Sequence, residues 1–310
     1  MSESKEEILK STGLITKFLG YRYRKNEGLL YSFDGRVPIE LITSYYSGDY
    51  DRLDPSIIHK GFLERYIINE SALEKVHNSS EIKGLEVMYE DMTRMPIEDF
   101  QLSGRSFKPS SLLALHSDLF CKTPYPEAGG KIREIQVFLP GSGANLCPPE
   151  DVYCKLRDLD YVVDDLKRLA IYMKESNDYS QIIEYISSCV KLKCELIKVH
   201  PFVDGNGRTI RCFINKLFEA AGIPPVYIKK DEKEEYTRAM ELAINEGDYN
   251  DITCFYLYEI CDSIMELDIN KRVREEREEK IYEERRGKKK LKQRPQQNLH
   301  LQGQNPTSVQ

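Results

Sequence analysis

The sequence predicts an all-α, mainly helical protein with one small β-hairpin, and two patterns support this prediction. Apolar residues recur at spacings of three, four and seven over most of residues 56–265, which is the period that buries one face of a helix. Within residues 135–139, Ile135, Val137 and Leu139 instead recur at every second position, as the apolar residues of a half-buried strand do. A chain of 310 residues is long enough for a substantial core.

We expect three regions along the chain. Residues 1–95 form an N-terminal helical region, although residues 1–55 indicate little beyond a helix near the start and some turns. Residues 96–265 form the main domain. Residues 266–310 are highly charged and then rich in glutamine, which predicts a solvated helix followed by disorder.

The first clear helical pattern runs from Ser56 to Glu90, and Gly84 is a point where it can break. The next helix covers residues 108–120 and has serines placed to cap its first turn. We assign His116, within this helix, to packing or to hydrogen-bonded structure.

The strand pattern at residues 135–139 is followed by Gly141-Ser142-Gly143, which allows a hairpin to return through Leu146. Two further helical runs cover residues 148–173 and 181–199.

Residues 198–225 combine several unlike side chains in one short window. His200 lies four residues before Asp204, Gly205-Asn206-Gly207 comes next, and Arg208 and Arg211 follow three residues apart. From Thr209 the apolar spacing is helical until Gly222 and a Pro-Pro pair. The glycines therefore lie in the turn that leads into a helix.

This arrangement favours the binding of a metal-bound polyphosphate beside a base. Glycines let backbone N–H groups converge at a helix N-terminus, where anions bind. Arginines three apart share a helix face and grip phosphate oxygens through two donors each. Asp204 suits Mg²⁺, which prefers one or two carboxylates beside phosphates. His200 can accept a proton near neutral pH.

A plainer interpretation stays open for each residue taken singly. The window could be an ordinary helix start, with Asp204 as its cap, His200 packed in the core, and both arginines solvated. The presence of all these residue types within twelve positions favours the functional interpretation.

Residues 200–211 resemble the Fic motif, H-x-F-x-[D/E]-G-N-G-R-x-x-R, at every defined position. The resemblance implies a mostly helical fold for residues 96–265 as a Fic catalytic domain. It also implies transfer of AMP from ATP to a hydroxyl side chain of a target protein.

The resemblance also implies a role for each motif residue. His200 would be the catalytic base and Asp204 the Mg²⁺ ligand. Gly205, Asn206 and Gly207 would hold the α- and β-phosphates. Arg208 would lie beside the β-phosphate, and Arg211 would bind the γ-phosphate. Phe202 would be buried and fix the loop.

Two other segments resemble parts of the family. The hairpin resembles the family's flap, which would add the target segment as an extra strand through Ile135, Val137, Phe138 and Leu139. After Pro225, Tyr236 stands where the family often has an aromatic residue near adenine. Asn245 is a candidate for the same pocket.

Residues 71–84 resemble the family's inhibitory-helix segment. Ser79 and Gly84 match the motif [S/T]-x-x-x-E-[G/N], but Lys83 stands at the glutamate position. That glutamate pairs with the second motif arginine in the family, whereas Lys83 would repel Arg211. We therefore expect weak or absent autoinhibition and poor hydrolytic removal of AMP. Glu81 would be a poor substitute, because two residues turn a helix by about 200°.

Net charge, apolar runs and cysteine spacing indicate which partners and which location to expect. The formal charge of −6 argues against nucleic acid as the main partner. No apolar run is long enough to span a membrane, and the charged first residues do not resemble a signal peptide, so we expect a cytoplasmic protein. Eight cysteines without a C-x-x-C pair predict reduced core thiols.

The favoured function is protein adenylyltransferase, with ATP as substrate, Mg²⁺ as cofactor and a serine, threonine or tyrosine hydroxyl as acceptor. Two alternatives stay open. One is another transfer on the same loop, of UMP, phosphate or phosphocholine. The other is a non-catalytic interaction protein. The resemblance also suggests a homodimer.

Overall fold

The structure of the protein is a computed structural model that describes residues 36–47, 59–94, 101–102, 105–139 and 143–266, with residues 280 and 282. Residues 1–265 belong to one compact unit, and residues 266–310 belong to a second. The predicted tail and the predicted helix near the start therefore lie almost wholly outside the described residues.

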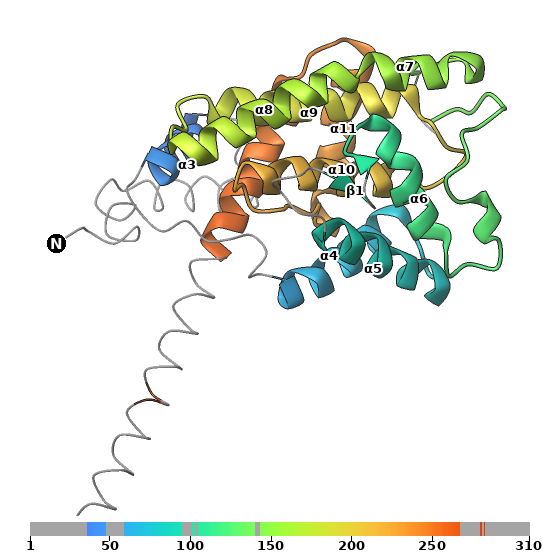
Figure 1. Ribbon diagram of the computed structural model, residues 1–310, viewed down its shortest axis with the longest axis horizontal. Helices are drawn as coiled ribbons and strands as arrows, with labels where there is room; N and C mark the ends of the chain where they lie inside the picture. The colour runs from blue at the N-terminus through green and yellow to red at the C-terminus, as the bar shows by residue number, and fades with distance from the viewer. Residues whose placement is uncertain are drawn as a thin grey trace, which may run out of the picture. The chain divides into compact units, whose positions relative to one another are not determined.

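The described part of the first unit is built of helices (Figure 1). The helices and strands are α3 (Arg36–Ser47), α4 (His59–Glu74), α5 (Ser79–Arg94), β1 (Gln101–Leu102), β2 (Arg105–Ser106), α6 (Leu112–Phe120), α7 (Val152–Asp158), α8 (Asp160–Ser176), α9 (Ile182–Val199), α10 (Asn206–Ala220), α11 (Lys233–Asn245) and a last helix over 250–266. Short 3₁₀ turns, labelled η, cover Pro109–Ser111, Pro126–Ala128, Pro149–Asp151 and Lys230–Glu232.

Helix α10 lies at the centre of this arrangement, in contact with α9, α8, α6, α5 and α4 (Figure 1). Every residue of α10 except Gly207 is buried. Phe213 stacks on Phe107 with ring centroids 4.3 Å apart, and the Tyr185 hydroxyl donates a hydrogen bond to the Leu217 carbonyl at 2.5 Å. The core therefore fixes the helix that carries both motif arginines.

The predicted all-α class is confirmed, and most predicted helices are present. The run from Ser56 to Glu90 divides into α4 and α5 around residues 75–78. The run predicted over 148–173 divides into α7 and α8. Helix α3 was not predicted, although its buried Leu41, Ile42, Tyr45 and Tyr46 have helical spacing.

Gly84 does not interrupt its helix, since it lies inside α5. A Cβ atom added there would lie 1.9 Å from the carbonyl oxygen of Leu119 on α6. Gly84 therefore lets α5 and α6 pack backbone to backbone, which only a residue without a side chain permits.

The predicted hairpin is not present among the described residues. Residues 131–139 and 143–147, which we call the flap segment, form no strand pairing, and β1–β2 is the sole strand pair within the described ranges. The backbone N–H groups of Arg133 and Cys147 bind the Pro201 and Lys198 carbonyls at 2.9 and 3.0 Å. These two amides are bound to the end of α9, so they are not available for pairing across the hairpin.

The structure also describes the cysteines and the lengths of the helices. All eight cysteines are free, and Cys189, Cys194, Cys212 and Cys261 are buried. None of the described helices is long and apolar enough to cross a membrane.

Candidate active site

The loop between α9 and α10 places His200 and Asp204 at the start of α10. His200 ends α9 in a left-handed backbone conformation, with φ 47° and ψ 63°. Gly205 precedes α10 with φ 75°, a conformation that glycine adopts without cost. The chain therefore turns sharply twice within six residues.

The contacts of the His200 ring suit a role as a base. Its Nδ1 lies 3.3 Å from the Ile197 carbonyl oxygen, and because a carbonyl only accepts, Nδ1 carries the hydrogen. Nε2 then has a free lone pair in the neutral ring. Burial lowers the pKa of His200, so the ring is neutral near pH 7.

Asn206 and Phe202 close the loop from inside. The Asn206 Nδ2 donates to the Phe202 carbonyl at 2.8 Å, and its Oδ1 accepts from the Phe202 N–H at 2.9 Å. Phe202 is fully buried, as the motif implied. The side chain of Asn206 thus holds the loop, which leaves its backbone N–H as the group that can contact a phosphate.

His116 supports the loop from α6, and its assignment to hydrogen-bonded structure agrees with its contacts. Its ring stacks on Phe202 at a centroid distance of 3.7 Å. Its Nδ1 accepts from the Gly130 N–H, and its Nε2 lies 2.9 Å from the Asp204 carbonyl oxygen. Burial lowers the pKa of His116 to about 4, so the ring is neutral.

Arg208 forms ion pairs with two acids. Its guanidinium lies 3.0 Å from the Glu81 carboxylate on α5 and 3.2 Å from the Asp204 carboxylate. The Asp204 Oδ1 also accepts from the Gly205 N–H at 2.7 Å. Arg208 is buried, whereas the Asp204 side chain is 71% exposed.

Arg211 also forms ion pairs with two acids, both from α4. The Glu70 carboxylate binds Arg211 Nε at 2.8 Å and Nη2 at 2.6 Å. The Glu74 carboxylate lies 2.5 Å from Nη2. Burial raises the pKa of Glu70, against the effect of Arg211. Burial also opposes ionisation of Glu74, but Arg211 outweighs it and the pKa of Glu74 is lowered.

These contacts correct the inhibitory-motif assignment at Ser79, Lys83 and Gly84. Lys83 is exposed on α5, so the expected repulsion of Arg211 is wrong. Gly84 serves helix packing, and Ser79 begins α5. The error was one of position, because the last turn of α4, rather than the first turns of α5, faces Arg211.

Glu74 fills the glutamate position when the family pattern is aligned on residues 70–75. Lys75 then stands at the Gly or Asn position, and its φ of 57° is the left-handed conformation those residues favour. Glu70 replaces the Ser or Thr of the pattern. Because Glu70 and Lys75 differ from the residue types of the pattern, the motif did not identify this segment.

The flap segment presents apolar side chains to solvent near the loop. Ile135 and Phe138 are 59% and 79% exposed, while Val137 and Leu139 are half-buried. Arg133 was missed by the sequence reasoning, although it is buried and bonds to the loop backbone. Residue spacing gave no signal for it, because His200 lies 67 positions away in the chain.

The two adenine-pocket candidates do not come together. Tyr236 on α11 is buried between Phe255, at a centroid distance of 5.6 Å, and the Lys193 ammonium, 4.6 Å from its ring. Asn245 is exposed at the end of α11. Nine residues turn a helix through about two and a half turns, so the two side chains lie on opposite faces.

The loop residues fit a phosphate group with a magnesium ion. The buried Nε of Arg208 has no hydrogen-bond acceptor in the described part of the chain, and a phosphate oxygen would supply one. A Cβ atom on Gly207 would meet the Glu74 carboxylate at 2.5 Å, so that anion lies against the first turn of α10. The exposed Asp204 carboxylate suits Mg²⁺.

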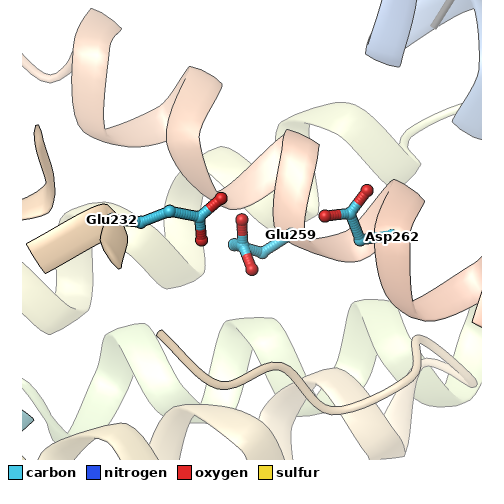
Figure 2. Close-up of side chains that lie close together, drawn as sticks. All are labelled: Glu232, Glu259 and Asp262. Atoms are coloured by element: carbon cyan, nitrogen blue, oxygen red, sulfur yellow. The ribbon is translucent and has the colours of Figure 1, made fainter. Parts of the chain in front are cut away.

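A second group of acids lies at the 3₁₀ turn Lys230–Glu232 and the last helix, where Glu232, Glu259 and Asp262 lie close together (Figure 2). The Lys229 ammonium lies 2.6 Å from Asp262, 3.3 Å from Glu259 and 3.7 Å from Glu232. A cation of the protein itself therefore occupies this group, which ties residue 229 to the last helix.

The fold and the loop together define the class: a helical domain in which a neutral histidine precedes a helix start lined by glycine and two arginines. Comparison with known proteins agrees. Residues 106–218 match the model of the Fic/DOC family, so this part of the chain is similar to Fic domains.

Named relatives also match part of the chain. The chain is 33% identical over 123 residues to "Protein adenylyltransferase Fic" of Drosophila melanogaster and 33% identical over 129 residues to that of Drosophila willistoni. Each match covers 40% of this chain and 22% of the relative. The chain thus matches about a fifth of the length of these relatives.

Two solved structures share the fold. A fragment of Fic-1 from C. elegans aligns with a TM-score of 0.58 at 19% identity, covering 77% of this chain and 73% of that one. A Fic domain containing signaling protein from Bacteroides thetaiotaomicron aligns with a TM-score of 0.52 at 15% identity, covering 74% and 95%.

Proposed function

We propose that this protein is a protein adenylyltransferase, which transfers AMP from ATP to a hydroxyl side chain of a target protein. The observation that carries the proposal is the His200 ring, whose Nδ1 faces the Ile197 carbonyl oxygen and so leaves Nε2 to accept a proton, beside a helix start that holds two buried arginines. The name of the Drosophila relatives supports the same reaction.

In the reaction, the target hydroxyl oxygen attacks the α-phosphorus of ATP, and Nε2 of His200 takes the hydroxyl proton. The bond from the α-phosphorus to the bridging oxygen breaks, and pyrophosphate leaves with that electron pair. The N–H groups at the start of α10 and the guanidinium of Arg208 stabilise the charge that moves onto the phosphates. The products are an AMP–target phosphodiester and pyrophosphate.

Asp204 is the residue that would hold Mg²⁺, which would neutralise phosphate charge when bound. Its carboxylate is the most exposed acid of the loop contacts and is already oriented by the Gly205 N–H. The flap segment would present Ile135 and Phe138 to the target, whose acceptor residue is a serine, threonine or tyrosine. Homodimerisation and a cytoplasmic location stay predictions.

Glu74 would restrain this activity. Its carboxylate lies against Arg211 and Gly207, where a terminal phosphate would bind. One acid and one phosphate cannot occupy the same donors together. The expectation of a weak lock, which rested on Lys83, is therefore replaced by a proposal of autoinhibition through α4.

The test is intact-mass measurement after incubation with ATP and Mg²⁺, on the Glu74→Ala chain with and without His200→Ala. We expect an added AMP on the chain itself or on proteins of a cell lysate, and none when His200 is replaced. An adduct of UMP, phosphate or phosphocholine, each tested with its own donor, would replace the proposal. No adduct from any donor would favour a non-catalytic interaction protein.

A further inference from the structure

Both limbs of the flap segment are fastened to the end of α9 by contacts that centre on one residue, Arg133. Its backbone N–H donates to the Pro201 carbonyl at 2.9 Å. Its Nε donates to the His200 carbonyl at 2.7 Å, and Nη2 donates to the Val199 carbonyl at 3.3 Å. Arg133 therefore binds three consecutive carbonyls centred on His200.

The same guanidinium reaches both limbs of the flap segment. Nη1 donates to the Ile135 carbonyl at 2.9 Å, and Nη2 also donates to the Cys147 carbonyl. The Cys147 N–H in turn donates to the Lys198 carbonyl at 3.0 Å. Four consecutive carbonyls at the end of α9 are thus satisfied by residues 133 and 147.

The chemistry of these contacts requires an arginine. The last carbonyls of a helix have no partner within the helix and carry partial negative charge, so a cation stabilises them. A guanidinium carries five N–H donors in a rigid planar fork, so it can bind several carbonyls at once. An ammonium carries its donors on a single nitrogen atom and acts as a point charge. Arg133 is only 2% exposed, so water does not compete for these bonds.

His200 gives these bonds a specific task. Its backbone is left-handed, which is disfavoured for a residue with a side chain. A conformation of this kind persists only where surrounding contacts impose it. Its own N–H is bound to Leu196, and its carbonyl is bound to Arg133.

We propose that Arg133 is a positioning residue of AMP transfer. It holds His200 in the left-handed conformation and fixes the flap segment to the same carbonyls, so base and bound target keep one relative position. This inference rests on the proposed function. The positioning role can be tested separately from nucleotide binding, because Arg133 binds the carbonyls of residues 199–201, which precede the phosphate-binding part of the loop.

The experiment compares Arg133→Gln and Arg133→Lys in the Glu74→Ala chain, which relieves the restraint on Arg211. Transfer of AMP is measured to the His200→Ala chain and to lysate proteins. Binding of the ATP analogue AMPPNP with Mg²⁺ is measured by calorimetry. We expect nucleotide affinity within about twofold of the parent but a transfer rate lower by about 100-fold for Arg133→Gln, the loss that misplaced reacting groups produce.

Arg133→Lys keeps the charge and loses the fork, so we expect a loss of at least about tenfold. If Arg133→Gln does not fold, the Arg133→Lys chain tests the proposal by itself. Parent-like transfer by Arg133→Lys would overturn the proposal, as would a loss of nucleotide affinity as large as the loss of rate.

A second readout follows the His200 ring itself by NMR across pH. Burial is the main cause that lowers the pKa of His200, and Arg133 lowers it further. The Ile197 carbonyl and Asp204 raise it, and Glu74 is replaced in every chain compared. Arg133→Gln should therefore raise the pKa of His200 and shift the low-pH limb of the rate profile to higher pH. An unchanged titration would overturn the proposal, and this readout stands even if no AMP transfer is found.

Lys216→Met is the matched control. It removes another buried cation, one that pairs with Glu219 at 3.1 Å further along α10. We expect it to lower thermal stability while leaving the His200 titration and the ratio of transfer rate to nucleotide affinity at parent values. The same changes in Lys216→Met as in Arg133→Gln would overturn the positioning role.

Discussion

The two arginines of the loop lie three residues apart on one helix, yet their acidic partners differ in exposure. Arg208 pairs with Glu81 and Asp204, whose side chains are 17% and 71% exposed. Arg211 pairs with Glu70 and Glu74, which are 1% and 34% exposed. Both guanidinium groups are themselves almost fully buried.

The difference indicates which arginine a nucleotide can reach first. An ion pair whose acid is in contact with water contributes little and is readily exchanged for another anion. Removing one partner of a buried pair leaves an uncompensated charge and costs much more. Arg208 can therefore exchange the exposed Asp204 for phosphate, whereas Arg211 is held by the buried Glu70.

Glu74→Ala should give the largest effect on activity. Loss of one charge-assisted hydrogen bond, about 1.5–3 kcal/mol, predicts AMP transfer faster by about 10- to 100-fold. Transfer would be followed by intact mass. Glu175→Ala, which removes an exposed glutamate on α8, is the control and should leave the rate unchanged. Equal rates in Glu74→Ala and the parent would contradict the restraint.

Glu70→Ala should instead act on stability. It leaves a buried guanidinium with one acid fewer, so we expect the free energy of unfolding to fall by about 2–4 kcal/mol. Urea denaturation measures this change. Glu70→Gln keeps the hydrogen-bonding shape and should lose less. A parent-like unfolding midpoint for Glu70→Ala would show that Arg211 is not held through this residue.

Glu81→Gln should have a smaller effect on binding. Removing a partly exposed acid from Arg208 should raise the affinity for AMPPNP with Mg²⁺ by about threefold, which corresponds to less than about 1 kcal/mol. Calorimetry gives the affinity. Lys83→Glu changes an exposed charge two residues away, and we expect it to alter neither binding nor transfer. Strong inhibition by Lys83→Glu would restore the assignment that the structure corrects.

Asp118→Asn should give the smallest effect, seen only as a dependence of stability on pH. Burial, together with Asp91, raises the pKa of Asp118 to about 6. The folded state therefore favours the protonated acid, and the stability it gives below the ordinary pKa is lost as pH rises through about 6. Asp118→Asn should raise the melting temperature by about 1–2 °C at pH 8 and hardly change it at pH 4. A difference that does not vary with pH would contradict this.

The sequence predicted the parts of the site that are contiguous in the chain. His200, Asp204, the glycines and both arginines lie within twelve residues, so spacing alone places them on one loop and one helix start. The helices followed for the same reason, since a face of a helix repeats every three or four residues.

The partners of those residues could not be predicted in this way. Glu70 and Arg211 are 141 positions apart, and Arg133 is 67 positions from His200. Nothing local marks such pairs. The position given to Lys83 shows the risk, because a partial match to a short pattern chose α5 when a different match, with Glu74, lay at the end of α4.

The close packing at Gly84 also limits how the restraint can be released. With its backbone resting on Leu119, α5 has no space in which to slide along α6. Glu81 can then leave Arg208 by rotating its own bonds alone, whereas a hinge is available at Lys75, where α4 ends. Under the proposed restraint, release of Arg211 would therefore involve the end of α4 that carries Glu74, with α5 as its fixed support.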